Sequence, residues 1–131
     1  MCANDAALPL RLSRVPKILI HLTSGPESPT RAALGFLVAK AAVDEGHEVD
    51  LFLAGDSVQL LRDDVLDSLV GLGTGSLRES YDAVVASGAR IYASGMSSKA
   101  RGLGELDLDG KPVEFAMPKS SWNSPSRATA Y

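Results

Sequence analysis

Apolar residues occur along this chain in short runs separated by longer segments with a different spacing. Residues 17–22, Lys-Ile-Leu-Ile-His-Leu, are nearly all apolar, and residues 48–53 and 89–93 form two further short runs. Short runs that are rich in aliphatic residues are typical of strands covered on both faces of a parallel sheet. A fourth, shorter strand is predicted over residues 112–116.

The segment between the first two runs has the spacing of a helix. Residues 30–45 are rich in Ala, Leu and Val, and Leu34 falls at helical spacing with the aliphatic residues that follow it. Ser28 is a favourable N-cap, and Pro29 suits the first helical position, where its missing N–H leaves no bond unmade. A strand, a helix and a strand joined by short loops form a βαβ unit, so the two strands are expected to be parallel.

Capping patterns predict further helices in the middle of the chain. Asp56 and Gln59 match a capping box and begin a helix that is predicted to end where the glycine-rich residues 71–75 begin. These glycines lack the spacing of a dinucleotide-binding loop, so we expect a flexible connection between two helices. Ser76 begins the next predicted helix, which ends at Gly88.

The composition limits the class of protein. The 131 residues are 45% hydrophobic and 22% charged, as expected of one domain with its own core. The net charge of -3 gives no basic surface for nucleic acid, and no apolar stretch approaches the ~20 residues of a membrane helix. The one cysteine, Cys2, cannot form an internal disulfide. We expect a cytoplasmic protein that binds neither membranes nor nucleic acid.

The two ends of the chain differ from its middle. Residues 1–14 lack the charged start and long apolar run of a secretory signal, and they are predicted to form a mobile leader. The α/β domain is expected over residues 15–117. Residues 118–131 contain few aliphatic residues and many serines, so they are predicted to form a divergent, weakly ordered tail.

Two loops qualify as ligand sites, because ligands of open α/β sheets bind beyond the carboxyl ends of the strands. Residues 23–28 follow the first strand, and residues 94–98 follow the third; the helix after this second loop is predicted to begin at Ser97 or Ser98. Backbone N–H groups, hydroxyls and helix dipoles at such positions suit small anions, although serines there also act as simple caps. Arg31 can add positive charge from the first helix. The candidate ligand-binding residues are Ser24, Gly25, Ser94, Gly95, Met96, Ser97, Lys99 and Arg101.

The sequence offers no clear catalytic or metal-binding set. His21 is expected to be a hydrogen-bonded residue near the core, because no Ser, Cys or carboxylate is placed to partner it as a base. Glu27 is the one carboxylate in either loop, so a mechanism with two carboxylates has no support. His, Asp and Glu do not occur at the spacing of metal ligands. We therefore expect no catalytic residue, no metal and no cofactor.

Several segments together resemble the DsrE/DsrF-like (DsrEFH-like) proteins. They are residues 17–25, the Ala-rich helix, residues 49–56 and above all residues 92–102, Tyr-Ala-Ser-Gly-Met-Ser-Ser-Lys-Ala-Arg-Gly. The resemblance extends from about residue 15 to residue 118. It implies a three-layer α/β/α sandwich with a mainly parallel sheet of four to five strands. It also implies a homotrimer or homohexamer and, for several members, a role in sulfur relay with persulfide sulfur carried on a cysteine.

The chain departs from the sulfur-carrying members of that family in the loop after the third strand. The resemblance leads us to expect a cysteine there, but the loop reads Ser94-Gly95-Met96-Ser97. A thiolate is the nucleophile in sulfur transfer, and a serine hydroxyl cannot hold a persulfide. The tail departs as well, because residues 119–131 show neither the helix nor the closing strand of the family.

The first functional hypothesis is a homo-oligomeric DsrE-like binding or accessory subunit that is related to sulfur-relay proteins. It would hold a small anion or sulfur compound between the loops at Ser24 and Ser94, and it is not expected to be an enzyme. A second hypothesis is an active sulfur carrier or sulfurtransferase subunit that uses Cys2 or the thiol of a sulfur-relay partner protein. A third is a flavodoxin-like flavin binder, because Thr23-Ser24-Gly25 is similar to a phosphate loop, although only 5% of the residues are aromatic.

Overall fold

The computed structural model describes residues 17–117 and 127–130 of the chain. Five strands form one sheet in the order β6-β5-β2-β1-β7, and every neighbouring pair is parallel. The α/β fold with a mainly parallel sheet is therefore confirmed, together with the βαβ unit at its start. The strands of this sheet are β1 (Lys17–Leu22), β2 (Glu48–Leu53), β5 (Arg90–Ser94), β6 (Val113–Ala116) and β7 (Arg127–Ala130).

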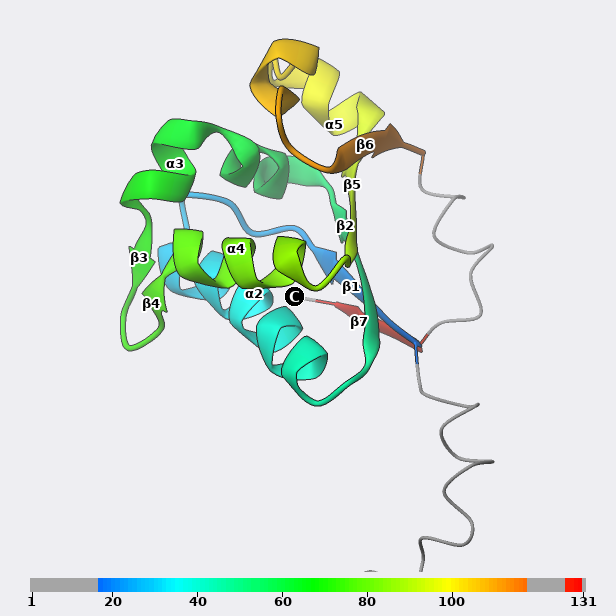
Figure 1. Cartoon of the computed structure of the whole chain (residues 1–131). Helices are drawn as coiled ribbons and strands as arrows, with labels where there is room; N and C mark the ends of the chain where they lie inside the picture. The colour runs from blue at the N-terminus through cyan, green and yellow to red at the C-terminus, as the bar shows by residue number, and fades with distance from the viewer. Residues whose placement is uncertain (1–16, 118–126, 131) are drawn as a thin grey trace, which may run out of the picture.

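Helices α2 and α4 lie side by side on one face of the sheet (Figure 1). Alternate residues of each strand point toward them, so Ile20, Leu51 and Ile91 are buried in one cluster with Phe36 of α2. No helix of the described ranges is long and apolar enough to cross a lipid bilayer. The helical segments are α2 (Pro29–Asp44), η2 (Gly55–Leu61), α3 (Asp63–Ser68), α4 (Leu77–Ala86), α5 (Gly95–Ala100) and η3 (Glu105–Leu108), of which η2 and η3 are 3-10 helices.

The segment between β2 and α4 differs from its prediction. One helix is predicted from Asp56 to Gly71, whereas the structure has η2, α3 and a short hairpin there. Arg62 separates η2 from α3 with an extended ψ of 138°. Its guanidinium donates to Asp107 Oδ1 at 3.2 Å and to the main-chain oxygen of Arg101 at 3.0 Å. These bonds to a distant part of the chain hold an extended residue where the local sequence favours a helix.

The glycine-rich residues 71–75 belong to that hairpin and do not form the predicted flexible connection. Strands β3 (Val70–Gly71) and β4 (Gly75–Ser76) pair in antiparallel fashion. The hairpin packs on the start of α2, where Leu72 N donates to Thr30 Oγ1 at 3.0 Å. A tertiary contact thus gives this segment a fixed place.

The last strand corrects the prediction for the tail. β7 pairs with β1, with Ile18 opposite Arg127. Strand pairing uses backbone groups, so an edge strand can form beside an aliphatic strand without an apolar pattern of its own. The predicted lack of a closing strand is therefore wrong for Arg127–Ala130. The predicted leader, residues 1–14, and residues 118–126 of the predicted tail lie outside the described part of the chain.

Candidate functional site

The two predicted ligand loops lie at the same edge of the sheet, with a third segment between them. β2 separates β1 from β5 in the sheet, so the turn after β2 comes between the loops that follow β1 and β5. Gly25 in the first loop packs against the main-chain carbonyl of Asp56. On the other side, Ser97 Oγ accepts a hydrogen bond from Gly55 N at 2.8 Å. Gly55 and Asp56, the first two residues of η2, form the turn after β2. This turn therefore lies in the gap between the two loops, where the sequence predicts a ligand.

The serines of the second loop make hydrogen bonds that shape the loop. Ser94 is buried and is the N-cap of α5, and its Oγ accepts a bond from Ser97 N at 3.2 Å. The helix begins at Gly95, so the predicted start at Ser97 or Ser98 is wrong. The reason is that Ser94, the last residue of β5, already supplies the capping oxygen.

Arg101 forms an ion pair with the turn after β2. Its Nε and Nη2 atoms each lie 3.0 Å from Asp56 Oδ1, and its Nη1 donates to the main-chain oxygen of Ser97 at 3.2 Å. The guanidinium thereby ties α5 to the Gly55–Asp56 turn. The positive charge that the sequence assigns to anion binding is balanced here by the carboxylate of Asp56.

The other predicted residues of the second loop differ in exposure. Gly95 is half-buried beside β6, with the carbonyl oxygen of Ala116 close to it. Met96 is 67% exposed. Lys99 is exposed and makes neither an ion pair nor a hydrogen bond with the described residues. Of these three residues, Lys99 alone can offer a charge to a ligand.

A cavity of about 340 Å³ lies beside the first loop. It is lined by Thr23, Ser24, Arg31 and Leu34, which combine a predicted ligand residue with the arginine expected to add charge. Helical spacing groups Leu34 with the core residues, but its side chain is 40% exposed. Arg31 and Leu34 are three residues apart on α2 and share one face of the helix. That spacing is the sequence signal that identifies them as one pair.

The polar groups of this cavity are available to a ligand to different degrees. Arg31 is exposed and has no carboxylate within ion-pair distance in the described ranges, in contrast to Arg101. Ser24 is half-buried and makes no hydrogen bond with those residues. Gly25 N already donates to Glu27 Oε2 at 3.0 Å, so this predicted donor is occupied. Arg31 and Ser24 are therefore the groups best placed to meet an anion.

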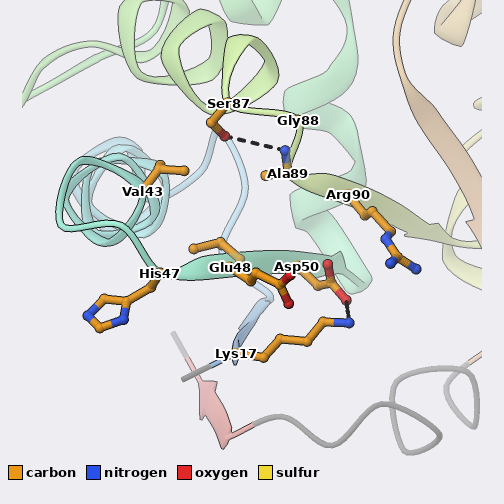
Figure 2. Close-up of a pocket in the computed structure, with 10 residues that line it drawn as sticks. Lys17, Val43, His47, Glu48, Asp50, Ser87, Gly88, Ala89 and Arg90 are labelled. Carbon is orange, nitrogen blue, oxygen red and sulfur yellow. Dashed lines mark hydrogen bonds and ion pairs between the residues drawn. The ribbon is translucent and has the colours of Figure 1, made fainter. Parts of the chain in front are cut away.

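A second cavity of about 220 Å³ lies at the opposite, amino-terminal ends of the strands (Figure 2). Lys17 Nζ is 3.4 Å from Asp50 Oδ2, and Glu48 lies beside this ion pair (Figure 2). A hydrogen bond with Tyr92, followed by the charges of Asp50 and Glu48, raises the pKa of the Arg90 guanidinium above its usual value. Among the described lining residues, the charges of Lys17 and Arg90 balance those of Glu48 and Asp50.

His21 lies on the sheet beside Phe52, with 5.6 Å between the ring centroids. Its position near the core is as predicted. The expected hydrogen bond is not found at Nε2, which is buried without a partner among residues 17–117 and 127–130. In those ranges, no group of three or more His, Cys, Asp and Glu side chains could hold a metal ion.

These features describe an α/β protein with a parallel sheet and with polar loops gathered at the carboxyl ends of its strands. The sequence matches the DsrE/DsrF-like family over residues 16–120, which is most of the chain. The protein therefore belongs to the DsrE/DsrF-like family, in agreement with the resemblance seen in its sequence.

A solved structure shows the same fold. The crystal structure of the YchN protein from E. coli matches with a TM-score of 0.71 at 16% sequence identity. The match covers 89% of this chain and 100% of the YchN chain. No curated protein matches the sequence. The comparisons thus establish the family and the fold.

Proposed function

We propose that this protein is a non-catalytic binding or accessory subunit of the DsrE/DsrF-like family that holds a small anion or a sulfur-containing compound. The observation that carries the proposal is the cavity of about 340 Å³ at the end of β1, where the side chains of Arg31 and Ser24 have no partner among residues 17–117 and 127–130. A guanidinium group is a strong donor to carboxylate, phosphate and related oxyanions. The carboxyl edge of a parallel sheet is also the usual place for ligands in this class of fold.

The loop after β5 supports the non-catalytic part of the proposal. This loop, in which sulfur-carrying relatives are expected to have a cysteine, reads Ser94-Gly95-Met96-Ser97, and Ser94 is buried as a helix cap. A hydroxyl has neither the acidity nor the nucleophilicity of a thiol near neutral pH. Cys2 is the one cysteine of the chain and lies outside the described residues.

Calorimetric titration with sulfate, phosphate and thiosulfate tests the binding proposal. We expect saturable binding at millimolar concentrations or below, and a loss of about tenfold in affinity for Arg31→Gln, because about 1.4 kcal/mol of a charged hydrogen bond is removed. Lys40→Gln is the matched control: it removes the same charge from the far half of α2, where Lys40 pairs with Asp44. Absence of binding at millimolar concentrations would contradict the proposal.

The variant Lys99→Gln separates the two loops as binding sites. If the anion binds at the first loop, Arg31→Gln weakens binding and Lys99→Gln has a much smaller effect. The opposite result would move the site to α5, where Lys99 has no ion-pair partner among the described residues. Both variants are at exposed positions, so neither is expected to disturb folding.

Persulfide labelling tests the claim that the protein does not transfer sulfur. The protein is incubated with a sulfur donor, and protein-bound sulfane sulfur is measured in the original chain and in Cys2→Ser. We expect no stable label on the original chain. A label that disappears in Cys2→Ser would instead make the protein an active sulfur carrier. A yellow preparation with flavin absorbance would support the flavodoxin-like hypothesis.

The proposal includes assembly into a cytoplasmic homo-oligomer, a trimer or hexamer, that works with a sulfur-relay partner protein. Exposed apolar side chains support an interface near the β6 edge of the sheet: Met96 is 67%, Phe115 38% and Met117 47% exposed. Solvent-exposed groups of this kind often mark surfaces that associate. Light scattering coupled to size-exclusion chromatography measures the assembly, and a monomer at micromolar concentration would contradict this part.

A further inference from the structure

The cavity at the end of β1 is larger than an inorganic anion requires. Its volume is about 340 Å³, which lies within the range of pockets for small organic ligands, about 300–1,000 Å³. A tetrahedral oxyanion takes the space of roughly two or three waters of about 30 Å³ each. It would therefore fill only about a quarter of the cavity, which leaves room for further ligand atoms.

The described lining of the cavity combines polar side chains with an aliphatic one. Ser24 and Arg31 are polar and have no partners in the described part of the chain. Leu34 presents an aliphatic side chain to the same cavity and is 40% exposed. Because Arg31 and Leu34 share one face of α2, a ligand whose anionic group meets the guanidinium can place its other end against the leucine.

From the size and the mixed polar and aliphatic lining, we infer that the ligand is a small organic anion with one anionic head group and a short apolar chain. This inference rests on the proposed anion-binding function and names the class of ligand. The head group meets Arg31 and Ser24, and the apolar chain covers Leu34. Short alkyl sulfonates have this chemistry, and they differ from sulfate by a carbon chain in place of one oxygen.

The experiment is a series of calorimetric titrations with sulfate and with methane-, propane- and pentanesulfonate. We expect the affinity to increase by up to about fourfold for each added methylene until the cavity is filled, which is the gain for burying that group. The variant Leu34→Gln should abolish this gain and leave methanesulfonate binding nearly unchanged. Leu106→Gln is the matched control, since Leu106 is 91% exposed on η3 and lies outside the cavity.

Failure of this inference is distinguishable from failure of the proposed function. Equal affinity for sulfate and for every sulfonate would overturn the organic-ligand inference while anion binding stands. A gain with chain length that persists in Leu34→Gln would overturn the role of the leucine, and with it the inference. No binding of any anion in the series would overturn the proposed function as well. Arg31→Gln should weaken all members of the series by a similar factor.

Discussion

Arg101 and Asp56 are 45 residues apart in the sequence, yet two guanidinium nitrogens of Arg101 lie 3.0 Å from one carboxylate oxygen of Asp56. The pair joins α5 to the turn after β2. Since that turn separates the two predicted ligand loops, the ion pair holds the centre of the whole loop cluster. The Asp56 carboxylate also balances the positive charge of Arg101.

A double-mutant cycle on this pair should show a measurable coupling energy. We expect Asp56→Asn and Arg101→Met to be coupled by about 0.5–1 kcal/mol in urea unfolding, because the pair is partly exposed and screened by solvent. The helical pair Lys40–Asp44 is the control, with about 0.3 kcal/mol expected. Independent effects of the two Asp56–Arg101 substitutions would show that the contact does not stabilise the fold.

Gly25→Ala should destabilise the protein by about 1–3 kcal/mol. A Cβ atom at this position meets the main-chain carbonyl of Asp56, and backbone cannot move aside as a side-chain end can. Gly104→Ala is the control: a Cβ there has open space and φ is −119°, so this variant should be neutral or slightly stabilising. Urea unfolding of the two variants measures the difference, and equal stabilities would refute the close approach.

Tyr81→Phe should stabilise the protein by about 1 kcal/mol at neutral pH. The Tyr81 side chain is 4% exposed, and its hydroxyl has no hydrogen-bond partner in the described ranges. Removal of an unsatisfied buried hydroxyl relieves its desolvation penalty while the ring keeps its packing against Phe36. Chemical unfolding measures the change, and a loss of stability would indicate that the hydroxyl has a partner after all.

The same residue should control stability at high pH. Burial, with a smaller contribution from Asp82 and Asp63 and against the effect of Arg78, raises the Tyr81 pKa to about 12. A raised pKa means that the folded state binds the proton more tightly than the unfolded state. The free energy of unfolding is therefore unaffected by this group below the ordinary pKa of about 10, and it falls between about pH 10 and 12. In Tyr81→Phe that loss should be smaller, whereas Tyr92→Phe should retain it.

Asp63 should contribute to stability on the acid side. A hydrogen bond from Lys111, together with its charge and that of Arg78, lowers the Asp63 pKa below its ordinary value. This contribution is therefore present above pH ~4 and is lost as the pH falls through the folded-state pKa. Unfolding midpoints of Asp63→Asn should depend less on pH in that acid window. Asp64→Asn, at the adjacent exposed position, serves as the control and should keep the original dependence.

The sequence by itself determined the elements that depend on local patterns. The aliphatic runs of β1, β2 and β5, the Ala-rich helix after Pro29 and the N-cap at Ser76 are where the pattern places them, within a few residues. The residues from Tyr92 to Gly102 also carried the family resemblance. They are consecutive, so the motif can be recognised in the sequence without knowledge of the fold. Periodicity, capping and contiguous motifs are encoded along the chain, so they can be seen without coordinates.

Only the tertiary structure decided which groups meet at the loops. Strand order placed Gly55 and Asp56 between the loops after β1 and β5, and this order depends on packing among distant segments. The same packing pairs Arg101 with Asp56, gives Arg31 no partner in the described part of the chain, and leaves Leu34 of α2 exposed. Arg127–Ala130 joins the sheet through backbone hydrogen bonds to β1. Such bonds do not require a particular pattern of side chains, so the sequence does not predict them. Charge balance and strand pairing depend on which residues are neighbours in space, and the order of residues along the chain does not specify those neighbours.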